Sequence, residues 1–328
     1  MSEVFPSKSP NTPLLPKGAP MRIICYLILL FTLPLNAQTP TDTEQYQGFS
    51  GYWLKNNRAE AFAIATPYPR IIAFQLKGGE NPLHVSRNYE YFGIRTWFFE
   101  PTQSSQSGMP ALQPATAERT GERSLRLAAA ADDSSGLQLT MEITLDAENP
   151  VLTVRHGLKN MRNEKRRIAA WALNVIRPDH GVGVTPWRTD QRRTFLIWPD
   201  TNPNEVGIHL GPKALAMDYR ILPQNRWQKI GTDGNAGWIA YVWNETALKS
   251  TVAHVANAEY PEGGGTVTMF NSTSEVFDGN PRFGEIENVG PLSDLMPGNT
   301  LWMEQELRLI SGIEGDDPES WVEVLNAE

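Results

Sequence analysis

Two glutamates near the end of the chain carry the clearest chemical signal. Glu285 and Glu287 lie two positions apart in the run FGEIENVGP, residues 283–291. In a β-strand, residues two apart project on the same face, and neighbouring carboxylates raise one another's pKa. The pair therefore suits either a proton-transfer site or a solvated face of a sheet. From the sequence alone the solvated face is the favoured interpretation.

A second segment combines aromatic and charged side chains. The run FGIRTWFFEP, residues 92–101, places Arg95, Trp97 and Glu100 at the end of a strand interrupted by glycine. The guanidinium group donates a rigid fork of hydrogen bonds, and an indole ring offers a flat apolar surface, so together they can hold a sugar ring. The alternative, favoured for this segment alone, is that Trp97 belongs to the core and Arg95 to a structural ion pair.

A third segment is the loop EYPEGGG, residues 259–265. Its glycines allow the backbone to approach a ligand closely, and Tyr260 and Glu262 could line the opening. A plain hairpin loop explains the same run equally well. His156, on an otherwise apolar strand face, is expected to be a buried core histidine rather than an acid catalyst.

Several classes of site are missing from the sequence. The five histidines are scattered, without the HxH or HExxH spacing of a metal site, and no GxSxG, P-loop or dinucleotide fingerprint is present. We therefore expect neither a metal nor a cofactor. The formal charge is −8, and only short basic runs occur, which argues against nucleic acid as a partner.

The chain from Gly51 onward shows almost only the two-residue period of half-buried strands. Strands are predicted at residues 125–131, 137–146, 151–158, 167–176, 238–243 and 249–256, and in the alternating run that ends at 310. Residues 101–120, rich in Ser, Gln, Pro and Gly, predict a long loop, and no run predicts a helix longer than a turn or two. We expect a single all-β domain over residues 45–325, with large packed antiparallel sheets.

The N-terminus has a different composition. Residues 1–20 are rich in Pro, Ser and Lys, and indicate a disordered or untranslated leader. Residues 21–37 have a basic start, a short apolar run and a small residue at the end, the layout of a secretory signal peptide. The only cysteine, Cys25, lies in this stretch. The mature protein is therefore expected in the bacterial periplasm or outside the cell, with no membrane attachment after cleavage.

Several of these runs, taken in order, resemble the galactose mutarotase-like superfamily, and more closely its branch of bacterial exported proteins. The runs are GGEN at 78–81, GIRTW at 93–97, WAL at 171–173, LIWP at 196–199, GWIAY at 237–241, YPEGG at 260–264, and residues 285–292 with the PG turn at 297–298. Together they cover nearly all of the mature chain.

The resemblance implies a β-supersandwich that binds a sugar or oligosaccharide in a cleft on the concave face of its larger sheet. Aldose 1-epimerases of this superfamily use a histidine acid and a glutamate base. Glu262, Glu285 and Glu287 are the candidates for the base. The candidates for contacts with the substrate are Arg95, Trp97, Glu100 and Tyr260.

One departure from the family pattern affects the expected activity. The strand at 169–174 lacks the family's histidine, and His180 could replace it only if the following loop folds back. A missing general acid would cost about 10² to 10⁴ in rate. The sequence thus leaves three functions open: an aldose 1-epimerase-like isomerase, a non-catalytic sugar-binding module, and a structural or interaction β-sandwich. It also leaves the oligomeric state open.

Overall fold

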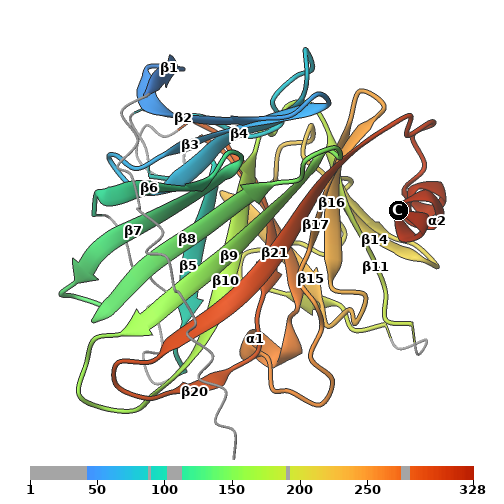
Figure 1. The fold of residues 1–328 in the computed structure, drawn as a ribbon. Coiled ribbons are helices and arrows are strands. Elements are labelled where there is room, and N and C mark those ends of the chain that lie inside the picture. Colours follow the sequence, from blue (N-terminus) through green and yellow to red (C-terminus); the bar gives the residue numbers. More distant parts are fainter. Residues whose placement is uncertain (1–42, 88–89, 102–112, 190–192, 275–280) are drawn as a thin grey trace, which may run out of the picture. The chain divides into compact units, whose positions relative to one another are not determined.

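The computed structural model describes residues 43–87, 90–101, 113–189, 193–274 and 281–328. The predicted leader (1–20) and signal peptide (21–37) lie outside these residues. Within them, the chain folds almost entirely into two antiparallel sheets (Figure 1). The all-β prediction with large antiparallel sheets is therefore confirmed.

The larger sheet has eleven strands in the described part of the chain. Its order is β1 (Glu44–Tyr46), β2 (Phe49–Lys55), β3 (Ala59–Ile64), β4 (Arg70–Leu76), β5 (Ile94–Phe99), β10 (Arg166–Ile176), β19 (Gly284–Val289), β18 (Val267–Ser272), β15 (Trp227–Thr232) and β12 (Leu196–Ile197), with β20 (Ser293–Leu295) also paired to β10. The central strands β5, β10 and β19 come from distant parts of the sequence.

The smaller sheet has ten strands among the described residues. Its order is β13 (Ile208–Leu210), β14 (Ala214–Asp218), β11 (Val182–Pro186), β16 (Trp238–Trp243), β17 (Thr246–Thr251), β21 (Thr300–Ser311), β9 (Val151–Asn160), β8 (Leu137–Leu145), β7 (Ser124–Asp132) and β6 (Ala115–Gly121). β21 lies beside β9 and β17 in Figure 1 and carries the predicted alternation, with Met303, Leu307 and Leu309 buried.

Three sequence expectations about individual elements are wrong. The strand expected at 249–256 is β17, Thr246–Thr251, and residues 252–256 form no strand. Residues 115–120, expected in a loop, form strand β6, which pairs antiparallel with β7 and has a register shift between Arg119 and Gly121. A ten-residue helix, α2 (Pro318–Ala327), ends the chain although no such helix was predicted. Asp317 caps it by accepting a hydrogen bond from the Glu319 amide at 3.1 Å, and Trp321, Val322 and Leu325 are buried on one side.

Helix α2 is in contact with β11 and β14 of the smaller sheet, and Figure 1 shows it beside those strands. A second helix, α1 (Pro261–Gly264), is a single turn. No helix in the described ranges combines the length and apolarity that a membrane span requires.

A polar network crosses the apolar core between the sheets. Thr96 Oγ1 lies 2.7 Å from His156 Nδ1, and His156 Nε2 lies 3.0 Å from Gln305 Oε1. Gln305 Nε2 donates to Asn174 Oδ1 (2.9 Å) and to Ser250 Oγ (2.8 Å). The prediction of a buried, satisfied His156 is confirmed, because its side chain is fully buried and both ring nitrogens have partners. The network ties β5 and β10 of the larger sheet to β9, β17 and β21 of the smaller one.

Burial lowers the pKa of His156 from 6.5 to about 4. As the pH falls below 6.5 the unfolded chain binds a proton at this residue before the folded chain does. The folded state is therefore at full stability above pH 6.5 and loses on the order of 3 kcal/mol by about pH 4.

We expect that loss to be reduced in His156→Gln, whose amide keeps polar atoms in the network and does not titrate. Urea unfolding at pH 7, 6, 5 and 4 measures it, as the difference in pH dependence between variant and wild type. His209→Gln, at a half-exposed histidine, serves as the control. Equal slopes in wild type and His156→Gln would contradict this account.

Candidate functional site

Glu285 and Glu287 lie on β19 in the middle of the larger sheet. Their neighbours Ile286 and Asn288 are buried toward the smaller sheet, so both glutamates project from the opposite side, here called the outer face. Both are nevertheless buried, at 5% and 1% exposure. The interpretation of a solvated sheet face is therefore wrong, because side chains from other strands cover these carboxylates.

Each glutamate is paired with one cation. Arg95 Nη2 of β5 lies 2.6 Å from Glu285 Oε1, and Lys229 Nζ of β15 lies 3.1 Å from Glu287 Oε2. Thr268 also donates its hydroxyl to Glu287 Oε2 at 2.5 Å. We call Glu285, Glu287, Arg95 and Lys229 the carboxylate cluster. Burial raises the pKa of Glu285 to about 7, opposed by Arg95 and reinforced by Glu287.

Aromatic rings flank both cations. The Arg95 guanidinium carbon lies 4.6 Å from the ring centre of Tyr91 and 4.8 Å from that of Trp97. Lys229 Nζ lies 4.4 Å from the ring of Trp171 and 5.1 Å from the ring of Trp198. The Trp97 and Trp171 rings are 6.1 Å apart. The cluster is thus bordered by flat apolar surfaces that also stabilise its positive charges.

Three buried polar atoms beside these charges have no hydrogen-bond partner within the described structure. They are Oε1 of Glu287 and the indole Nε1 atoms of Trp97 and Trp171. A buried polar group without a partner costs about 1–3 kcal/mol. Such groups are rare in native structures, so each one calls for an explanation. One carboxylate acceptor and two indole donors are matched by a ligand that carries hydroxyl groups.

Glu262 is connected to the cluster only indirectly. It lies in α1 with a positive φ of 52°, and its Oε1 accepts a hydrogen bond from Trp198 Nε1 at 3.1 Å. Trp198 in turn contacts Lys229. Tyr260 instead holds its own loop together: its hydroxyl accepts a hydrogen bond from the Val255 amide at 2.9 Å, and its ring stacks on His254.

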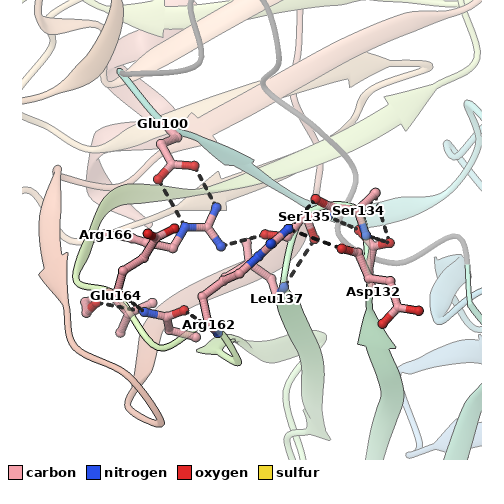
Figure 2. Close-up of polar contacts among 11 residues, drawn as sticks. Glu100, Asp132, Ser134, Ser135, Leu137, Arg162, Glu164 and Arg166 are labelled. Carbon is pink, nitrogen blue, oxygen red and sulfur yellow. Dashed lines mark hydrogen bonds and ion pairs between the residues drawn. The ribbon is translucent and has the colours of Figure 1, made fainter.

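Glu100 lies in a separate ion pair (Figure 2). Arg166 Nε and Nη2 contact the two oxygens of Glu100 at 3.0 and 2.6 Å, and Nη1 donates to the Ser135 carbonyl at 2.7 Å. Both charged residues are buried. This arrangement joins β5 and β10 to the turn between β7 and β8, which is a structural use of Glu100.

His180 lies in the segment after β10. Arg177 Nη2 donates to His180 Nε2 at 2.6 Å, so that nitrogen is an acceptor. The neighbouring Asp179 is held by Arg282 at 3.0 Å. No described contact joins His180 to the carboxylate cluster. Likewise, no group of histidine, cysteine and acidic side chains suited to a metal ion occurs in the ranges that the structure covers.

The structure thus brings Arg95, Trp97, Glu285 and Glu287 together, with Glu262 at the edge. Sequence reasoning missed Lys229, Trp171, Trp198 and Thr268 as members of this site. Lys229 occupies an outward position in the strand WQKIGT, where a lysine is normally solvated. Its role depends on β18 and β19 pairing beside it, and no local pattern reveals that pairing.

No family model matches the sequence, and no curated protein resembles it in sequence. Solved structures do match the fold. A galactose mutarotase-like protein from Lactobacillus casei aligns with a TM-score of 0.55 and 9% identity, over 79% of this chain and 100% of that one. A galactose mutarotase related enzyme from Lactobacillus acidophilus aligns at 0.50 and 9%, over 81% and 99%.

A third match is a TPR-domain containing protein from Parabacteroides distasonis, with a TM-score of 0.53, 15% identity and coverage of 83% of this chain but 48% of that one. These similarities show that the chain has the galactose mutarotase-like β-sandwich fold. The fold predicted from the sequence is confirmed.

Removing Arg95 tests the buried ion pair. Glu285, with a pKa of about 7, is ionised at pH 9. Arg95→Met leaves this charge buried without its cation, so we expect a loss of about 3 kcal/mol in the free energy of unfolding at pH 9. Adding Glu285→Gln removes the stranded charge and should recover part of this loss. Denaturant unfolding of the single and double variants measures both effects.

The matched control is Arg155→Met. Arg155 pairs with Glu142 at 2.5 Å on the surface, with 44% of its side chain exposed, so its loss should cost less than about 1 kcal/mol. Equal losses in Arg95→Met and Arg155→Met would show that burial of the Arg95–Glu285 pair has no energetic consequence.

Proposed function

We propose that this protein binds a sugar on the outer face of its larger sheet, at the carboxylate cluster. The observation that carries the proposal is the set of unpartnered buried atoms, Glu287 Oε1 and the indole nitrogens of Trp97 and Trp171. They lie among the flat rings that border Arg95 and Lys229. The fold shared with galactose mutarotase-like proteins supports the same function.

The proposed chemistry follows from the two kinds of surface. Sugar hydroxyl groups both donate and accept, so they can donate to Glu287 Oε1 and accept from the indole N–H groups. The apolar face of a sugar ring packs on an aromatic ring. Lys229, with 14% of its side chain exposed, and the half-buried Trp198 form the accessible side of the cluster, and we propose that the sugar enters there.

We further propose that the protein acts outside the cytoplasm. This rests on the signal-peptide pattern of residues 21–37 and on the absence of cysteine from the rest of the sequence. Its sugar would then be one met in the periplasm or outside the cell.

A second candidate function is catalysed exchange of sugar anomers. The specific observation in its favour is Glu285, whose pKa of about 7 suits proton transfer near neutral pH. A base at this position needs an acid partner. Among the residues that the structure describes, no histidine contacts Glu285. For this reason sugar binding is the primary proposal.

Binding can be tested with a thermal-shift panel of monosaccharides and uronic acids, followed by calorimetry on each stabilising sugar, since a ligand that binds the folded state raises the melting temperature. We expect Trp171→Phe, which keeps an aromatic ring and removes the N–H donor, and Glu287→Gln to weaken binding at least tenfold. Glu304→Gln, exposed on the smaller sheet, should have no effect. Unchanged affinity in both site variants would place the sugar elsewhere.

Anomer exchange can be followed by NMR on every sugar that binds. If Glu285 is the base, its ionised form is needed, so the rate should rise with pH through about 7. Glu285→Gln should lower the rate by about 10² to 10⁴. Exchange no faster than in buffer alone would leave the protein a sugar-binding module.

A further inference from the structure

His84 lies on the same face of the larger sheet as the carboxylate cluster. Leu83 bridges to Ile176, and both are buried in the core between the sheets. The next residue, His84, therefore projects to the outer face, and its amide donates to the carbonyl of Val175 at 2.9 Å. Val175 in turn pairs with Glu285. Two strand spacings, about 10 Å, thus separate His84 from Glu285.

One nitrogen of the His84 ring is buried and unsatisfied. Its Nε2 has no hydrogen-bond partner among the residues that the structure describes. Burial lowers the pKa of His84, opposed by Asp179, so the ring is neutral at pH 7 and Nε2 can meet a hydroxyl group as donor or acceptor.

His84 lines a pocket of about 530 Å³. The other polar side chains that line the same pocket are Tyr46, Gln47, Gln75, Glu80, Asn81 and Arg177. Beside the pocket, on the outer face, lies an apolar cluster that includes Phe62, Ile72 and Phe92. Tyr46 and Val85 pack against this cluster. Tyr46, Val85 and His84 therefore place part of the pocket lining on the outer face, on the β4 side of the carboxylate cluster.

The polar groups of the pocket define its ligand. The charges are one arginine and one glutamate, Arg177 and Glu80, whose side chains lie 3.9 Å apart. The remaining groups are a phenol, three carboxamides and a neutral imidazole. This balance offers no net charge for an ion. The Asn81 amide is already bonded to the backbone of residues 72, 74 and 83. The phenol, the Gln47 amide and the His84 ring still offer donors and acceptors side by side, as a ring with several hydroxyl groups requires.

We propose that this pocket is a second sugar subsite, and that the ligand is an oligosaccharide lying along the outer face from the carboxylate cluster to His84. The inference rests on the proposed function, because it extends the same ligand. It assigns roles to His84 and Glu80, neither of which touches the carboxylate cluster. A chain of two or more sugar units covers the distance of two strand spacings.

Calorimetry with cello-, malto- and chito-oligosaccharides of one to six units tests the proposal on wild type, His84→Phe, Glu80→Gln and Glu287→Gln. The expected result is a series in which affinity rises at least tenfold from the monosaccharide to the longer ligands. His84→Phe and Glu80→Gln should each lower the affinity for the longer ligand at least fivefold and leave that for the monosaccharide unchanged.

His209→Phe, on β13 of the smaller sheet, is the control for a histidine change, and should bind every ligand as wild type does. Glu80 is exposed, so Glu80→Gln keeps the test valid if His84→Phe does not fold.

Three results would overturn the proposal in distinguishable ways. Affinity independent of chain length, with monosaccharide binding still lost in Glu287→Gln, would leave the proposed function standing and remove the second subsite. If the affinity for the long ligands depends on His84 and not on Glu287, the pocket is a separate site and not part of a continuous one. No binding of any ligand would remove both the subsite and the proposed function.

Discussion

The burial of two neighbouring carboxylates is the constraint on which the larger sheet depends. Glu285 and Glu287 project from the same face of β19 and are almost wholly removed from water, which is costly unless each negative charge is compensated. Compensation comes from Arg95 of β5 and Lys229 of β15, strands on opposite sides of β19. The two ion pairs therefore require β5, β10, β19, β18 and β15 to be assembled in this order, and the aromatic rings beside the cations shield the pairs from solvent.

The other side of the same strands is equally constrained. Thr96 is the neighbour of Arg95 in β5, and its hydroxyl contacts His156 of the smaller sheet. Asn288 follows Glu287 in β19 and accepts a hydrogen bond from Ser250 at 2.5 Å. A shift of β5 or β19 by one residue would turn the charged side chains into the core and the network outward. The core network thus holds in register the strands that present Arg95 and the glutamates, and it links the stability of the sandwich to the geometry of the outer face.

The sequence contained enough information to predict the architecture and to name some residues of the candidate site. Period-two alternation identified most strands, and Arg95, Trp97, Glu285 and Glu287 were recognised by residue type. The burial of the glutamates could not be predicted, because it depends on side chains that arrive from strands distant in the sequence. Lys229 was missed for the same reason. Helix α2 was missed because its apolar side chains are buried only by packing on β11 and β14. Local sequence does not reveal that contact.

The central claim is that a sugar occupies the outer face at the carboxylate cluster. A crystal structure with a stabilising sugar bound tests it most directly, because it locates the ligand without relying on a substitution. The account predicts sugar hydroxyl groups within hydrogen-bond distance of Glu287 Oε1 and of the Trp171 indole nitrogen, with a sugar ring against one of the bordering aromatic rings. A sugar bound on the smaller sheet, or one whose density lies away from both atoms, would contradict it.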